Sequence, residues 1–160
     1  ALIRLAEQGC ELRPLDFGPM HELGELLYNG PWVAERYAVL EEMLERKPEA
    51  VNEVVRGIVL PGRVFSAADA FRALQRRDDL CEVIERLMAT VDALVVPTTP
   101  GIWTRAEINA SPVALNARLA TYTNFVNLLG WCALSLPAGK RGDGLPYGIT
   151  LLSPGGHDAA

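Results

Sequence analysis

Two side chains near the start of the chain, Tyr28 and Arg36, carry chemistry that a small polar ligand can use. A guanidinium group binds a carboxylate through two parallel hydrogen bonds, and a phenol donates a hydrogen bond to a carbonyl oxygen. On one straight helix the two residues would lie about 12 Å apart along the axis. Gly30-Pro31 interrupts the run, because Pro favours the first turn of a new helix and Gly can precede it. The two side chains are therefore expected on successive elements, from which they can converge.

The helix expected over residues 31–46 places Arg36 near the middle of an apolar arc. The apolar members of this arc are Trp32, Val33, Tyr37, Val39, Leu40, Met43 and Leu44. An unpaired buried charge is costly, so the arginine must extend to solvent or meet a carboxylate. The simpler interpretation is an ion pair with one of the chain's own acids. The alternative is a cleft in which Arg36 binds an anionic substrate.

Threonines form a second candidate group, after a compact apolar run. Residues 92–96 predict a buried strand that leads into Pro97-Thr98-Thr99-Pro100. In open α/β sheets ligands gather beyond the carboxyl ends of strands, so Thr98 and Thr99 are placed where a site could lie. Threonines beside prolines are also ordinary turn residues, which is the simpler interpretation.

A third group is a stripe of uncharged polar side chains on the helix expected over residues 111–129. Asn116, Thr123 and Asn127 fall on one flank of that helix. Such groups either hydrogen-bond neighbouring loops, which is the simpler interpretation, or orient a polar ligand in a cleft.

No complete catalytic centre is visible, and no catalytic residue is predicted. The sequence has no Gly-rich phosphate loop, no Gly-x-Ser-x-Gly elbow and no paired catalytic carboxylates. Ser66 and Ser111 are explained as helix N-caps, and the lysines are Lys47 and Lys140.

Composition argues against several other functions. The 160 residues include 15 Lys or Arg and 20 Asp or Glu, for a net charge of −5. An acidic chain without a basic run is not expected to bind nucleic acid or an anionic membrane. Two histidines and three dispersed cysteines predict no metal site, and buried free thiols are expected. No secretory signal or long apolar run is recognisable, so a cytoplasmic location is expected.

The pattern of elements predicts one α/β domain with a mixed β-sheet flanked by helices. Helices are expected over 1–8, 18–29, 31–46, 51–60, 66–91 and 111–129, strands over 11–17, 92–96, 132–137 and 146–152, and a loop over 101–110. The chain opens within a helix and without an initiator Met, so we expect it to be part of a longer protein.

Four stretches together resemble the amidase signature family, and in particular its allophanate-hydrolysing branch. They are residues 27–37, 65–71, 92–98 and 121–129. The first stretch points to that branch, whereas the other three are shared more loosely among amidases. The resemblance implies an α/β amidohydrolase of urea degradation that converts allophanate to ammonia and carbon dioxide, after a biotin-dependent urea carboxylase has formed the substrate.

The resemblance also assigns roles to residues. Family members use a serine nucleophile, a second serine on a cis peptide bond and a lysine, all of which precede the matched region. Residues 1–160 would therefore be the later, C-terminal portion of a single amidase domain, inactive alone. Tyr28 and Arg36 transfer as substrate-binding residues, and neither a cofactor nor a metal is implied. The expected partners are allophanate and the preceding part of the domain, with a functional link to urea carboxylase, and a homodimer is left open.

Two alternatives to this interpretation stand beside it. One is another signature amidase, including the amidotransferase subunit that works on misacylated tRNA. The other is a non-catalytic interaction module descended from an amidase. A Gly/Ser-rich signature with its lysine in an upstream reading frame would favour the enzymes, and a start codon just before Ala1 would favour the module.

Overall fold

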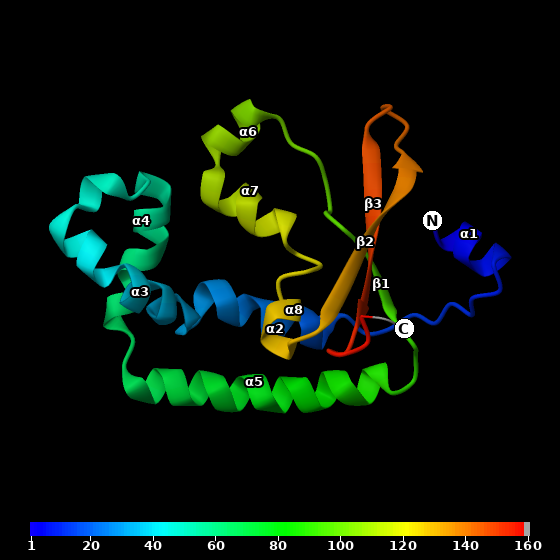
Figure 1. Ribbon diagram of the computed structural model, residues 1–160, viewed down its shortest axis with the longest axis horizontal. Coiled ribbons are helices and arrows are strands. Elements are labelled where there is room, and N and C mark those ends of the chain that lie inside the picture. The colour runs from blue at the N-terminus through cyan, green and yellow to red at the C-terminus, as the bar shows by residue number, and fades with distance from the viewer. Residues whose placement is uncertain (159–160) are drawn as a thin grey trace.

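Helices form most of the first two thirds of the chain, and two of the three strands described in residues 1–158 come near its end (Figure 1). The computed structural model describes residues 1–158. With η marking 3₁₀ helices, the elements are α1 (Leu2–Glu7), α2 (Gly18–Asn29), α3 (Trp32–Arg46), η1 (Pro48–Ala50), α4 (Glu53–Val59), η2 (Leu60–Val64), α5 (Ala67–Met88), β1 (Leu94–Pro97), α6 (Arg105–Ala110), α7 (Pro112–Leu119), α8 (Val126–Leu129), β2 (Cys132–Lys140) and β3 (Pro146–Ser153). The predicted α/β class is confirmed. Within the described part, no helix is long and apolar enough to cross a membrane.

The last strand lies in the middle of the sheet. The strand order is β1-β3-β2, and both pairings are antiparallel. Thr150 of β3 lies opposite Val96 of β1 on one side and opposite Ser135 of β2 on the other. The strands predicted over residues 132–137 and 146–152 are confirmed as β2 and β3, and the turn between them has a hydrogen bond of 2.9 Å from the Gly144 N–H to the Arg141 carbonyl. The strand β1 therefore receives its partner from a segment far along the chain.

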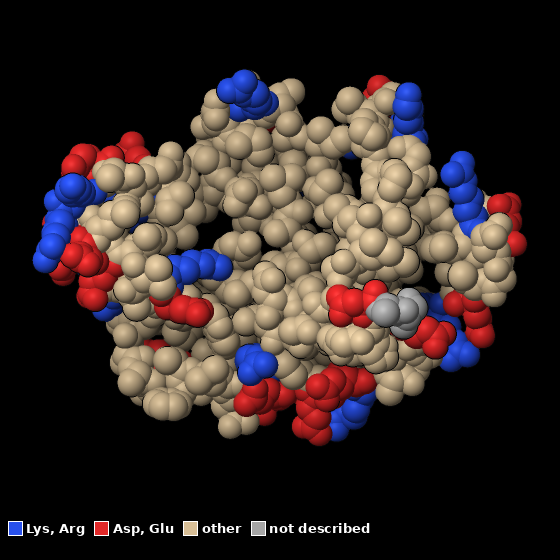
Figure 2. Space-filling view, in the orientation of Figure 1, with Lys and Arg blue, Asp and Glu red and all other residues tan. Residues whose placement is uncertain are grey.

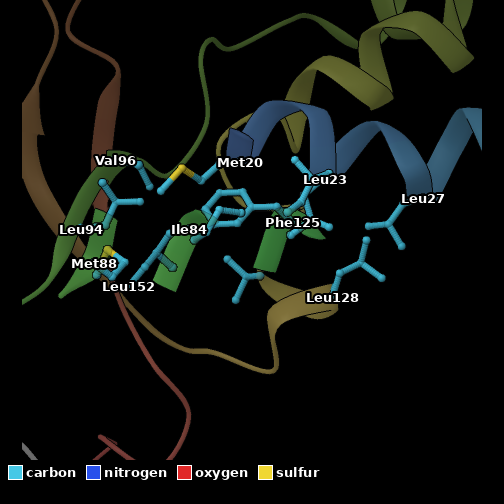
Figure 3. Close-up of a cluster of buried hydrophobic side chains, with 12 residues drawn as sticks. Met20, Leu23, Leu27, Ile84, Met88, Leu94, Val96, Phe125, Leu128 and Leu152 are labelled. Atoms are coloured by element: carbon cyan, nitrogen blue, oxygen red, sulfur yellow. The ribbon is translucent and has the colours of Figure 1, made fainter. Parts of the chain in front are cut away.

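The hydrophobic core lies where α2, α5 and α8 meet one end of the sheet (Figure 3). Its buried members are Met20, Leu23, Leu27, Leu80, Ile84, Met88, Leu94, Val96, Phe125, Val126, Leu128 and Leu152. Helical spacing explains the contributions of α2 and α5, because residues three or four apart share one face. Burying each large apolar side chain contributes about 1.5–3 kcal/mol. The core thereby fixes α2, the helix that carries Tyr28.

The opposite sheet face has little cover from the described residues. Residues directly opposite each other in a sheet share a face, so Val95, Leu134 and Leu151 lie together on the side away from the core. Leu134 is 57% exposed and Leu136, two residues further along β2, is 39% exposed. We call these four residues the outer sheet face.

The predicted N-terminus of the longest helix is confirmed by its hydrogen bonds. The Asp69 N–H donates to Ser66 Oγ at 3.2 Å, and the Ser66 N–H donates to Asp69 Oδ2 at 2.9 Å. This reciprocal pair is a capping box, which satisfies two of the backbone donors left free at a helix start. The helix α5 ends at Met88 rather than near Val91.

The strand predicted over residues 11–17 is wrong. This segment has no strand partner in the sheet that the structure describes. Pro14 has no N–H to give to a ladder, and the Asp16 side chain accepts from the Gly18 N–H at 2.9 Å, which turns the chain into α2. A side-chain contact ties the segment down instead, because Arg13 Nη1 donates to the Thr90 carbonyl at 3.3 Å.

The loop predicted over residues 101–110 is wrong in its second half. Helix α6 begins after Thr104 with a second capping box, in which the Thr104 N–H donates to Glu107 Oε2 at 2.7 Å and the Glu107 N–H donates to Thr104 Oγ1 at 3.2 Å. The Thr-x-x-Glu spacing of this box is present in the sequence and predicts a helix start.

The single helix predicted over residues 111–129 is two helices, α7 and α8, with a turn between them. Residues of low helix propensity fill the turn, and Thr121 Oγ1 donates to the Arg118 carbonyl at 2.8 Å, which competes with the helical pattern. Phe125 at the end of the turn is fully buried and packs edge-to-face on Phe17, with ring centroids 5.6 Å apart. The helix end predicted at residue 129 is confirmed, because Gly130 follows it in the left-handed conformation with φ 64°.

Candidate functional site

A sharp break at Gly30 separates the helices that carry Tyr28 and Arg36. Gly30 is buried, and a Cβ atom on it would lie 2.7 Å from the Leu26 carbonyl oxygen, closer than real Cβ atoms approach. Pro31 then precedes α3 with φ −67°, which its ring favours. The close contact explains why glycine stands at this position. The break also lets α3 leave α2 at an angle, as the Gly30-Pro31 pair predicts.

The structure brings Tyr28 and Arg36 together. The Arg36 Cζ atom lies 5.8 Å from the centroid of the Tyr28 ring, within the range of a cation–π contact. Arg36 Nη1 also donates to the Leu27 carbonyl at 3.3 Å. That carbonyl lies in the last turn of α2, where the helix dipole is negative and attracts a cation. The guanidinium is thus held against the end of α2, and we call this pair of side chains the Tyr28–Arg36 corner.

The predicted ion pair between Arg36 and an acid of the same chain is wrong. Among residues 1–158 no carboxylate lies within 4.0 Å of its side-chain nitrogens, although the same helix carries an ion pair between Arg46 and Glu42 at 2.9 Å. The Arg36 side chain is half-buried, and among the described residues the Leu27 carbonyl is the one acceptor of its hydrogen bonds. Because a guanidinium has five N–H donors, most of its bonding capacity is free for a ligand.

Tyr28 has a similarly free polar end. Its side chain is 36% exposed, and its hydroxyl makes no hydrogen bond with the residues that the structure describes. The molecular surface is hollowed above α2, between the α3–α4 lobe and α7 (Figure 2). The phenol and the guanidinium can therefore both face solvent or a ligand.

Helix α3 is held in place by a close backbone contact one turn before Arg36. A Cβ atom on Gly62 of η2 would lie 2.6 Å from the Val33 carbonyl oxygen and 3.0 Å from Ala34 Cα. Only glycine fits at such a distance, so Pro61-Gly62 packs on α3. The helix predicted over residues 51–60 is α4, which ends at Val59, and Leu60–Val64 follow as the 3₁₀ helix η2.

The two threonines after β1 lie at another place. Thr98 Oγ1 and Ser135 Oγ lie 2.9 Å and 2.8 Å from the buried hydroxyl of Thr150, so three hydroxyls form a chain across the sheet. Thr99 Oγ1 donates to the Gly101 carbonyl at 3.1 Å, as the turn interpretation predicts. Thr98 and Thr99 line a cavity of ≈ 580 Å³, but neither member of the Tyr28–Arg36 corner does.

The predicted polar stripe does not exist as one helix face, because the helix is broken. Asn116 is exposed on α7, Thr123 is half-buried in the turn, and Asn127 is exposed on α8. The prediction missed Asn124, the buried amide of this region, which lies against Gly24 of α2. A glycine in the middle of a helix signals a close approach of another group, and this signal could have found the contact.

The cysteines are free, as expected, but only two are partly buried. Cys10 is exposed, which corrects the expectation that all three are buried. Burial raises the pKa of the Cys81 thiol, the largest of several effects on it. A raised pKa lowers the thiolate fraction and makes the thiol less reactive.

Comparison with known proteins assigns this α/β segment to one enzyme family. The whole chain, residues 1–160, matches the profile of the family described as Amidase. The chain belongs to the amidase family, and the resemblance inferred from the four sequence stretches is confirmed.

The chain is similar to urea amidolyase of Saccharomyces cerevisiae, with 41% identity over 154 residues, which make up 95% of this chain and 8% of that protein. Its structure is similar to that of Kluyveromyces lactis allophanate hydrolase, with a TM-score of 0.92, 38% identity and coverage of 96% of this chain and 26% of the other. The crystal structure of K. lactis urea amidolyase gives a TM-score of 0.92 and 38% identity, and covers 96% of this chain and 9% of that chain. The chain thus spans about 8% of the length of the two urea amidolyases that it matches.

Proposed function

We propose that this chain is part of an allophanate hydrolase, an amidohydrolase of urea degradation, and that it supplies the substrate-binding corner. The observation that carries the proposal is the half-buried guanidinium of Arg36, which stacks on Tyr28 and has no carboxylate partner among the described residues. The similarity to proteins named urea amidolyase and allophanate hydrolase supports the choice of substrate.

Allophanate fits this corner chemically. It is a small anion with a carboxylate at one end and a terminal amide at the other. The Arg36 guanidinium can bind the carboxylate through charge-assisted hydrogen bonds, while the Tyr28 hydroxyl donates to a carbonyl oxygen. Holding both ends fixes the scissile amide before a nucleophile, which lowers the entropic part of the barrier. In this proposal the serine nucleophile and the lysine belong to the preceding part of the domain.

The outer sheet face is the surface on which we place that preceding part. Leu134 and Leu136 expose apolar side chains on it, and contiguous exposed apolar surface marks a site of contact. The functional link to a urea carboxylase, which forms allophanate, belongs to the same proposal.

The proposal is tested by Arg36→Ala in the complete enzyme that contains this chain. Removing a hydrogen bond to a charged group costs roughly 1.5–3 kcal/mol, or about 10- to 150-fold in an equilibrium constant. We expect kcat/KM for allophanate to fall by about this range. The loss should be much smaller for the neutral substrate malonamide, and Arg36→Lys should restore only part of the activity, because the planar fork is absent.

Arg46→Ala provides the matched control, since Arg46 lies on the same helix and is exposed in its ion pair with Glu42. Arg46→Ala should leave kcat/KM for both substrates unchanged. If Arg36→Ala instead lowers the unfolding temperature and reduces turnover of both substrates equally, Arg36 is structural and the proposal is wrong.

A further inference from the structure

Asn124 makes an unusual buried contact with the helix that carries Tyr28. The residue is 9% exposed, and its Oδ1 atom is buried without a hydrogen-bond partner in the part of the chain that the structure describes. The amide lies on Gly24 of α2, one helical turn before Tyr28. A buried carbonyl without a partner is unfavourable. Hydrogen bonding inside this chain therefore does not account for an asparagine at this position.

Shape accounts for the contact better. A Cβ atom on Gly24 would lie 2.3 Å from Asn124 Oδ1, 2.7 Å from Cγ and 2.8 Å from Nδ2, all shorter than real Cβ contacts. The amide fills the space that a side chain at position 24 would need. Helix α2 can therefore approach the turn between α7 and α8 only because residue 24 is glycine. The Asn124 side-chain amide thus packs directly against α2 at Gly24.

The position of Asn124 is fixed by its own turn and by the hydrophobic core. The Asn124 N–H donates to the Ala120 carbonyl at 2.9 Å, which closes the turn. The next residue, Phe125, is fully buried and packs edge-to-face on Phe17 and Trp131, with centroid distances of 5.6 Å and 6.2 Å. Moving the Asn124 backbone would therefore disturb the core (Figure 3).

We propose that Gly24 and Asn124 are positioning residues for the Tyr28–Arg36 corner. Their contact sets where α2 lies relative to the α7–α8 turn. It thereby sets the position of the Tyr28 ring and of the Leu27 carbonyl that binds Arg36. This inference rests on the proposed function. It matters for the enzyme because Tyr28 and Arg36 can bind allophanate well only from the correct positions, and a misplacement of about 1 Å at such a group can cost about 100-fold.

The test is a double-mutant cycle in the complete enzyme, with KM and kcat for allophanate and malonamide and a thermal melt for each variant. Gly24→Ala should raise KM for allophanate about tenfold, a size expected for coupled neighbours, with a smaller effect on kcat. Asn124→Ala should raise KM less. The double variant should be no worse than Asn124→Ala alone, because removing the amide makes room for the added methyl group.

Gly57→Ala is the matched control. It adds the same methyl group to the interior of α4, where no atom lies within 4 Å, so KM should not change. If Gly24→Ala alone does not fold, the double variant should recover folding, and its KM can still be compared with that of Asn124→Ala. A double variant that stays unfolded would contradict the contact.

The outcomes separate this inference from the proposed function. A KM increase in Gly24→Ala that persists unchanged beside Asn124→Ala would overturn the positioning role. So would a loss of thermal stability that the second substitution rescues while KM for allophanate stays at the wild-type value. Arg36→Ala tests the corner independently, because equal losses on the two substrates would reject the corner even where the Gly24–Asn124 coupling is found.

Discussion

At the scale of single residues, Arg36 does two things with one side chain. One N–H group binds the Leu27 carbonyl and fixes the guanidinium at the end of α2, and the other donors are free among the described residues. A side chain that is already held loses less conformational entropy when a ligand arrives. The Tyr28 ring lies beneath the guanidinium in a cation–π contact, and the Tyr28 hydroxyl makes no hydrogen bond with the described residues.

The two members of the corner should therefore respond differently to substitution. Tyr28→Phe keeps the ring beneath Arg36 and removes only the hydroxyl. Loss of a neutral hydrogen bond of about 0.5–1.5 kcal/mol predicts a fall in kcat/KM of roughly 2- to 13-fold. Because allophanate and malonamide both present a carbonyl, both should be affected alike, without a change in unfolding temperature.

Tyr147→Phe serves as the control, because Tyr147 is similarly exposed (37%) but lies on β3. Steady-state kinetics of both variants on both substrates decide the matter. An effect of Tyr28→Phe on allophanate alone would show that the hydroxyl contacts the carboxylate end.

The convergence of Tyr28 and Arg36 could be predicted because Gly30-Pro31 is a local signal, readable without knowledge of the fold. The partner of Arg36 could not, since helical periodicity shows which face a residue occupies but not what lies opposite. Asn124 was missed for a related reason. Its importance depends on the approach of α2, and the sequence marks this approach only through Gly24.

At the scale of elements, the two capping boxes make the stability of two helix N-termini depend on pH. Hydrogen bonds from the Ser66 hydroxyl and N–H hold the pKa of Asp69 below its ordinary value, and those from the Thr104 N–H and hydroxyl do the same for the pKa of Glu107. A carboxyl whose pKa is lowered by folding stabilises the fold above its unfolded pKa. That contribution is lost as the pH falls through the folded pKa.

Asp69→Asn should therefore reduce the acid sensitivity of the fold. The variant should unfold at a lower temperature than the wild type near pH 7. The difference should shrink as the pH falls from about 4, the ordinary pKa of an aspartate, through the lowered pKa that Asp69 has in the folded state. Thermal melts of the complete enzyme between pH 3 and 7 measure this. Glu42→Gln, in an exposed ion pair on α3, is the control, and a constant difference at every pH would contradict the prediction.

Elements with start and stop signals in the sequence were predicted well, as α2, α3 and α5 show. Helix α6 was missed although its Thr104–Glu107 spacing repeats the signal found at Ser66. The break between α7 and α8 is a different case, because burial of Phe125 in the core outweighs the helical pattern around it. The strand predicted over residues 11–17 fails because alternation alone cannot supply a neighbouring strand.

At the scale of the whole molecule, the outer sheet face sets what the isolated chain can do. Exposed apolar surface and open sheet edges favour association with other chains. We expect the 160-residue chain to release no measurable ammonia from allophanate, because positioning groups without a nucleophile cannot form an acyl-enzyme. It should also self-associate in size-exclusion chromatography.

The complete enzyme, assayed in parallel, is the positive control for ammonia release. Robust turnover by the purified 160-residue chain would contradict both the proposed division of labour and the placing of the chemistry elsewhere. If the chain elutes as a monodisperse monomer, the outer sheet face does not drive association and that prediction is wrong.

The strand order has a consequence for synthesis on the ribosome. Strand β1 leaves the tunnel well before its neighbour β3, so Leu94 and Val96 lack their β3 partners while residues 98–145 are still being added. Helices α2 and α5 can meet during this interval, but Leu152 has yet to arrive. The nascent chain therefore carries this apolar strand without its β3 neighbour for a long stretch of translation. Such an intermediate exposes hydrophobic surface to other chains and to chaperones.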